Sequence, residues 1–126
     1  MQRLTLLLLV LALLPSVDAK TKPKKKNERF YQEVWCTDRG ISEFILPDRT
    51  RVDCLTETHA IEFDWAKKWA EGIGQSLYYS LQTGKRAGVV LILKRRKHYK
   101  YWIRLNSTID QFGLPIDTWL IEVYEL

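Results

Sequence analysis

The sequence predicts an α/β domain in which helices flank a mixed central sheet, and three observations predict it. Apolar residues recur at every fourth position over 65–81, which is typical of an amphipathic helix. Short segments of strand character over 41–64 are separated by brief turns, which favours antiparallel hairpins. The continuous apolar run at 88–93 is typical of a buried strand that lies parallel to its neighbour.

The first residues have the pattern of a secretory signal peptide over 1–19. Residues 4–14 are almost wholly apolar, follow the positive charge of Arg3, and are too few to span a bilayer. Residues 17–19, Val-Asp-Ala, resemble a signal-peptidase site, and the alternative is an uncleaved N-terminal anchor. We therefore expect an exported protein, periplasmic or secreted, with no stable membrane anchor after cleavage.

The expected mature protein is one domain over 28–126, preceded by a basic leader over 20–27. The chain of 126 residues carries a formal net charge of +5, and five lysines crowd the leader around Pro23. This composition predicts a solvated, disordered segment. An arm that attracts polyanions is the alternative.

The two cysteines, Cys36 and Cys54, are expected to pair, because export places them in an oxidising compartment. Closing this short loop would stabilise the fold by about 3 kcal/mol on the chain-entropy model. A thiolate zinc site is disfavoured, because it needs about four ligands and the only histidines, His59 and His98, lack ligand spacing. Both histidines are expected at the surface.

The first half of the domain is expected to be a helix followed by a β-meander. Asn27 can cap a helix from about 28 to 38, which Gly40 ends. Two apolar pairs spaced four apart give this helix its stripe: Phe30 with Val34, and Tyr31 with Trp35. Strands are expected at 41–46, 51–55 and 60–64, with turns at 47–50 and 56–59.

The second half is expected to add a helix, a strand, a helix and a strand. The longest helix begins at Asp64 or Trp65 and ends at Gly84, and its stripe should pack on the sheet. That stripe consists of Trp65, Trp69, Ile73, Leu77 and Leu81. A strand at 88–93, a helix at about 99–112 and a strand at 119–124 complete the order α-β-β-β-α-β-α-β.

Three carboxylates are predicted to share one face of the meander. Side chains alternate along a strand, so Glu62 and Asp64 point to one face while Ile61 and Phe63 point to the other. Asp53 falls near Glu62 if their strands pair through the intervening turn. Three like charges are unfavourable unless a cation offsets them, and carboxylates with a backbone carbonyl are ligands that Mg²⁺ prefers.

Each carboxylate also has a purely structural explanation. Asp53 and Glu62 could face solvent and form ion pairs with Arg49 or Arg51. Asp64 could serve only as the N-cap of the following helix.

The predicted order of elements resembles that of the PD-(D/E)xK, or restriction-endonuclease-like, nuclease superfamily. That order is a helix, a three-stranded meander that carries Asp and then Glu, a second helix and a parallel strand. The matching residues are Arg51-Val52-Asp53, Ile61-Glu62-Phe63-Asp64 and Gln75, within a stretch from about 27 to 93. Glu33 stands where many members carry a further acidic residue in the first helix. The chain departs from the family at Asp64, which occupies the place of the usual lysine, and Lys67 is the candidate replacement.

The resemblance implies metal-assisted hydrolysis of phosphodiester bonds in nucleic acid, with Mg²⁺ or Mn²⁺ as cofactor. The implied catalytic residues are Asp53, Glu62, Lys67 and Gln75, and the implied metal ligands are Asp53, Glu62, Asp64 and Glu33, together with the Phe63 carbonyl. Lys67 would orient the attacking water or stabilise transition-state charge, and Gln75 would position Lys67, the water or the phosphate. Both could equally be ordinary exposed helix residues. DNA is favoured over RNA as the partner, and a homodimer is an arrangement that enzymes cutting both strands often use.

Residues 94–102 interleave basic and aromatic side chains, a composition that suits phosphate contact and stacking on bases. The candidate nucleic-acid-binding residues are Arg95, Arg96, Lys97 and Tyr99. The alternative is a charged loop whose aromatic residues begin the next amphipathic helix.

Three functions are consistent with the sequence. The first is an exported, metal-dependent nuclease. The second is a catalytically inactive module of the same fold that binds nucleic acid or another polyanion, which Asp64 in place of the lysine favours. The third is an exported interaction scaffold, since a fold does not determine a function.

Overall fold

The structure, a computed structural model, describes residues 25–124. The expected signal peptide and most of the basic leader lie outside the described residues. The described chain forms three α-helices and a five-stranded mixed sheet, which confirms the predicted α/β class. Within the same residues, no helix combines the length and the apolar character needed to cross a membrane.

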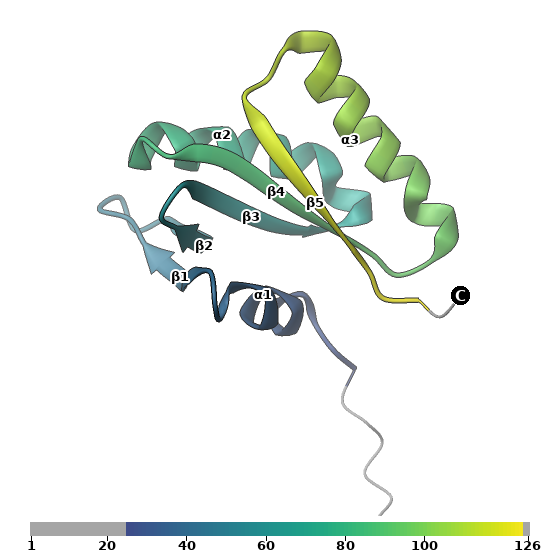
Figure 1. The fold of residues 1–126 in the computed structure, drawn as a ribbon, viewed down its shortest axis with the longest axis horizontal. Helices are drawn as coiled ribbons and strands as arrows, with labels where there is room; N and C mark the ends of the chain where they lie inside the picture. Colours follow the sequence, from purple (N-terminus) through teal and green to yellow (C-terminus); the bar gives the residue numbers. More distant parts are fainter. Residues whose placement is uncertain (1–24, 125–126) are drawn as a thin grey trace, which may run out of the picture.

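The sheet has the strand order β1-β2-β3-β4-β5, antiparallel in its first half and parallel in its second (Figure 1). The elements in chain order are α1 (Glu28–Cys36), β1 (Gly40–Ile45), β2 (Arg51–Thr56), β3 (His59–Trp65), a 3-10 turn (Ala66–Lys68), α2 (Trp69–Thr83), β4 (Arg86–Leu93), a second 3-10 turn (Arg96–His98), α3 (Tyr99–Phe112) and β5 (Ile116–Glu122). The order of elements is the predicted one.

The differences from the predicted boundaries are small and fall at element ends. Helix α1 ends at Cys36 instead of residue 38, and β5 begins at Ile116 instead of residue 119. Asp64 remains in β3, and the 3-10 turn that follows has Trp65 at its N-cap position without a side-chain hydrogen bond. Asp64 therefore does not cap a helix.

Helices cover both faces of the sheet, with α1 on one face and α2 and α3 on the other (Figure 1). Strand β4 contacts both layers. Val90 and Ile92 pack in the cluster that contains Cys36 of α1, whereas Val89 packs in the cluster that contains Leu105 of α3. A strand covered on both faces has no side that favours polar residues, which explains its continuous apolar run.

The predicted helical stripes are wrong at four positions. Trp65 belongs to β3 and packs on the cluster that contains Cys36, on the sheet face opposite to α2. Phe30, Val34 and Leu81 have exposed fractions of 40%, 63% and 78%. Each lies two residues from a buried residue of its own helix, Gln32 in α1 or Tyr79 in α2. Two residues correspond to about 200° around a helix axis, so these three side chains point to solvent.

The predicted disulfide is confirmed. Cys36 and Cys54 are bonded, with their Cα atoms 5.8 Å apart, and both side chains are fully buried. The bond joins the last residue of α1 to the middle of β2.

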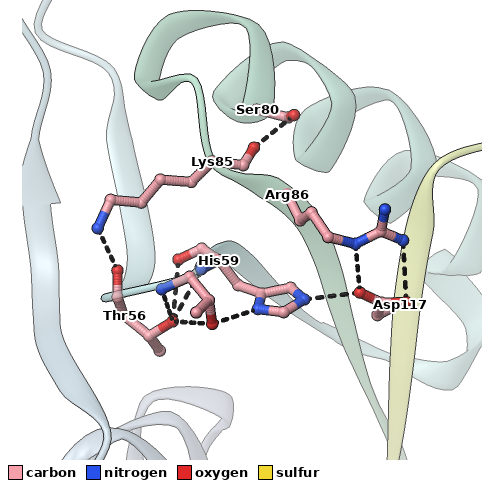
Figure 2. Close-up of polar contacts among 7 residues, drawn as sticks. Thr56, His59, Ser80, Lys85, Arg86 and Asp117 are labelled. Atoms are coloured by element: carbon pink, nitrogen blue, oxygen red, sulfur yellow. Dashed lines mark hydrogen bonds and ion pairs between the residues drawn. The ribbon is translucent and has the colours of Figure 1, made fainter.

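Polar side chains join the three parallel strands at their amino ends (Figure 2). Asp117 of β5 accepts a hydrogen bond from Nε of Arg86 in β4 (2.7 Å) and pairs with Nε2 of His59 in β3 (2.6 Å). These bonds, that from Arg86 first, lower the pKa of Asp117 to about 2. His59 is thus a partly buried link between strands, and its predicted surface position is wrong.

Candidate functional site

Asp53, Glu62 and Asp64 lie on the sheet face covered by α2, in agreement with the predicted alternation. Phe63, between the two acidic residues of β3, packs on the opposite face beneath α1. Asp64 approaches α2 closely, because a Cβ atom at Gly72 would lie only 2.9 Å from its Oδ2 atom. The acidic face of the meander is therefore enclosed by a helix.

Asp53 is held in place where strands β2 and β3 stop pairing. Their last pair in this direction is Cys54 with Ile61. Beyond it, Oδ2 of Asp53 accepts a hydrogen bond from the Phe63 amide at 2.8 Å, in place of a bond between the two backbones. On the other side, Nε2 of the buried Gln32 donates to the Asp53 carbonyl oxygen at 2.8 Å. The first contact orients the Asp53 side chain, and the second holds its backbone.

Glu62 and Asp64 are buried without full hydrogen bonding. Their exposed fractions are 6% and 5%. Oε2 of Glu62 and Oδ2 of Asp64 have no hydrogen-bond partner among residues 25–124. Since an unsatisfied buried polar atom lowers stability, and a charged one lowers it more, these two oxygens call for a ligand or a proton.

Burial and neighbouring acidic charges raise the pKa values of all three carboxyl groups. Burial, followed by the charges of Asp53 and Asp64, raises the pKa of Glu62 to about 10. Burial, followed by the charges of Glu28 and Asp53, raises the pKa of Asp64 to about 8. Burial also raises the pKa of Asp53 to about 6, although the hydrogen bond from the Phe63 amide opposes the shift. At neutral pH the cluster therefore retains protons unless a cation replaces them.

Helix α1 contributes a fourth acidic residue, but it is Glu28 and not the predicted Glu33. Glu33 forms an ion pair with Arg29 at 2.8 Å and is half-exposed. The charge of Glu28 raises the pKa values of Asp53, Glu62 and Asp64, and burial raises its own pKa. Glu28 follows the N-cap directly, and a carboxylate in a first turn also stabilises a helix, so the sequence pattern did not single it out.

Asp53 and Glu62 open into one cavity of about 420 Å³ together with Gln75 of α2. The remaining lining residues are Ile45, Arg49, Thr50, Arg51 and Tyr79. Arg51 pairs with Glu43 at 2.6 Å, and no ion pair to Asp53 or Glu62 occurs in the part of the chain that the structure describes. The alternative in which Arg49 or Arg51 neutralises the two carboxylates is thus absent from this geometry.

Lys67, the candidate lysine, and its neighbour Lys68 have different surroundings. The charge of Lys68 lowers the pKa values of both Asp64 and Glu28, which places Lys68 beside the carboxylates. Lys67 instead acts on His98, whose pKa it helps to lower. Of the two lysines, Lys68 therefore has the surroundings that the resemblance implies for Lys67.

The basic segment that follows β4 contributes to a second cavity, also of about 420 Å³. Of the predicted nucleic-acid-binding residues, Arg95 and Lys97 line it, whereas Arg96 and Tyr99 are exposed outside its lining. His98 is 7% exposed, so the surface position predicted for it is wrong.

No group of three or more His, Cys, Asp or Glu side chains within residues 25–124 converges closely enough to hold a metal ion as the side chains stand. The donor chemistry still fits a hard divalent cation. Asp53 and Glu62 share one cavity, and Oε2 of Glu62 is buried without a partner. Mg²⁺ keeps several waters and requires only one or two protein carboxylates, so this pair suffices in number.

No protein-family model, no curated protein and no solved structure matches this chain. The resemblance to the nuclease superfamily therefore stays a prediction, and the functional argument depends on the residues and geometry described above.

Proposed function

We propose that this chain is an exported, metal-dependent nuclease that hydrolyses phosphodiester bonds, built on a PD-(D/E)xK-like core. The observation that carries the proposal is the buried pair Asp53 and Glu62, which share a cavity while an oxygen of Glu62 lacks a partner. A purely structural role gives no reason to bury these acidic groups, because their burial lowers stability even when they hold protons. The buried disulfide supports export, since such bonds persist in oxidising compartments.

Asp53, Glu62 and the Phe63 carbonyl would hold the metal. The N–H and C=O groups of one strand residue point to the same side, and the Phe63 N–H points to Asp53. When bound, Mg²⁺ or Mn²⁺ supplies Lewis-acid polarisation of the phosphate and a lowered pKa for bound water. Lys68 would stabilise negative charge beside Asp64, and Gln75 would orient the phosphate or the attacking water from α2.

A cleavage assay with a matched pair of variants tests the proposal. Purified protein is incubated with plasmid DNA and with RNA in Mg²⁺, in Mn²⁺ or in EDTA. Glu62→Gln should reduce metal-dependent cleavage by at least about 100-fold, because it removes a charged donor from the metal site. Glu33→Gln is the control, since Glu33 pairs with Arg29 in a half-exposed position. Equal cleavage by Glu62→Gln and wild type would show that the site is misassigned.

A second candidate is an inactive module that binds nucleic acid. Asp64 stands where the nuclease superfamily carries its lysine, and it lies against Gly72. Lys67 lines the second cavity together with His98 and does not line the cavity of Asp53 and Glu62. This candidate predicts binding that weakens steeply with salt and no turnover in either metal. Folded protein that binds DNA but leaves it intact in every lane would favour it over the nuclease.

A further inference from the structure

The second cavity, which we name the basic cavity, lies outside the carboxyl ends of the parallel strands β3 and β4. Its lining combines the end of β3, the 3-10 turn and the segment after β4: Lys25, Trp65, Ala66, Lys67, Lys68, Ile92, Lys94, Arg95, Lys97 and His98. Six of these side chains are cationic and none is a carboxylate. The carboxyl ends of adjacent parallel strands are a frequent position for ligand sites in α/β folds.

The positive charge of the basic cavity is not neutralised by the described part of the protein. None of its lysines, nor Arg95, forms an ion pair with an acidic residue among residues 25–124. The pKa of the buried His98 is lowered by burial and then by the charges of Lys67, Lys97, Arg95 and Lys100. Like charges gathered around one cavity repel one another, and an anion in the cavity relieves this repulsion.

The chemistry of the cavity favours a compact phosphate over an extended backbone. A terminal phosphomonoester carries a charge of about −1.5 to −2 at neutral pH, more than the single charge of a phosphodiester. Trp65 adds an aromatic ring with Nζ of Lys94 over its face, 3.9 Å from the ring centroid, so a base would stack on Trp65 by displacing this exposed lysine. Trp65 directly follows Asp64 in β3, and the charge of Lys68, which lines the cavity, lowers the pKa of Asp64, so the basic cavity lies near the carboxylates although no residue lines both cavities.

We infer that the basic cavity binds the terminal phosphate of a nucleic-acid strand, with the adjoining nucleotide against Trp65. This inference rests on the proposed nuclease function and adds a substrate class to it: strands with phosphorylated ends. A strand end held here lies next to the carboxylate cluster, so cleavage proceeds from phosphorylated ends in preference to internal positions.

The first test measures binding without cleavage. Fluorescence anisotropy in EDTA compares single-stranded oligonucleotides with a 5′-phosphate, with a 3′-phosphate and with hydroxyls at both ends. One of the phosphorylated strands should bind about tenfold more tightly than the unphosphorylated strand, since a charge-assisted contact exists only for the phosphate. Glu62→Gln should retain this preference, which separates the inference from the cleavage chemistry.

Two neighbouring arginines provide the matched variants. Arg95→Ala should abolish the preference for a phosphorylated end, because Arg95 lines the cavity, whereas Arg96→Ala removes the same charge outside the lining and should retain it. Lys97→Ala should behave like Arg95→Ala. Equal affinity for all three strands, or a preference that survives both lining variants, would overturn the inference. Metal-dependent cleavage without any end preference would overturn it while leaving the nuclease proposal intact.

Discussion

Glu62 and Asp64 combine a buried position with a carboxyl oxygen that no described residue satisfies. Residues selected for stability alone would be apolar or fully hydrogen-bonded at such positions. Groups whose pKa values are strongly raised by burial and by like charges are also more frequent at functional sites than elsewhere. At the scale of single residues, the cluster therefore exchanges stability for an ability to bind a cation.

This exchange predicts a stability that falls as pH rises. The pKa values of Asp64 and Glu62 are raised to about 8 and about 10, above their unfolded values near 4. The folded protein thus holds protons that the unfolded chain has released, and each carboxyl lowers the free energy of unfolding by up to about 1.4 kcal/mol per pH unit. The decline in the free energy of unfolding should be clearest between pH 6.5 and 8. His98, whose pKa is lowered, raises the free energy of unfolding as pH rises, but only below this range.

Urea unfolding of metal-free protein across this pH range measures the effect. Glu62→Gln should be more stable than wild type at pH 8 and should show a shallower decline. Mg²⁺ should raise the melting temperature of wild type at pH 8 and have little effect on Glu62→Gln, because ligands that bind only the folded state stabilise it. A wild-type stability that stays constant or increases from pH 6.5 to 8 would contradict the assignment of raised pKa values.

Strand alternation was sufficient to predict that Glu62 and Asp64 share a face, because the period of a strand is a local property. The partner from α1 was not predictable in the same way. Glu28 and Glu33 are both acidic residues of one short helix, and only the direction in which α1 crosses the sheet brings Glu28 to the cluster. Contacts between distant elements depend on packing angles that residue patterns do not specify.

At the scale of elements, helix α2 determines how closely the carboxylates are enclosed. Its buried face consists of Gly72, Ser76 and Tyr79, of which the first two are small. The apolar stripe predicted for this helix did not include them, because it was defined by the spacing of large apolar side chains. Small residues allow the helix backbone to approach the sheet, and this approach places Asp64 against Gly72.

Two glycines of α2 give a matched test of this close approach. Gly72→Ala would place a Cβ atom 2.9 Å from Oδ2 of Asp64 and 3.3 Å from Val89, so it should displace the carboxylate and weaken metal binding. Gly74→Ala meets no atom within 4 Å and should stabilise the helix by about 0.5–1 kcal/mol. Thermal unfolding and Mg²⁺ titration of both variants separate the two effects. Unchanged metal affinity in Gly72→Ala would show that α2 does not constrain the site.

At the scale of the whole molecule, the sheet has an antiparallel half and a parallel half. A disulfide stabilises the first half, and a polar network stabilises the second. The Cys36–Cys54 bond fastens α1 to the antiparallel half. Asp117, with Arg86 and His59, fastens the amino ends of the parallel strands (Figure 2). The carboxylate cluster lies on β2 and β3, and β3 is the strand where the antiparallel half meets the parallel one.

The disulfide should contribute substantially to the stability of the whole domain. Its cysteines are 18 residues apart, so replacing both by Ala should lower the free energy of unfolding by about 3 kcal/mol through the entropy of the unfolded chain. Urea unfolding of the double variant and of oxidised wild type measures the difference. If the two transitions coincide, packing of α1 on β2 alone holds this half of the fold.

The change from antiparallel to parallel pairing also implies an order of assembly. Every strand pairs with the strands next to it in sequence, but the connections differ: short turns join β1, β2 and β3, whereas β4 and β5 are reached only through the crossovers α2 and α3. Contacts between near neighbours form early, and those that need long crossovers form slowly. Asp53 and Glu62 would thus come together in a chain that still lacks the helix enclosing them, and the cluster would gain its burial and its shifted acidity only in the final stages of folding.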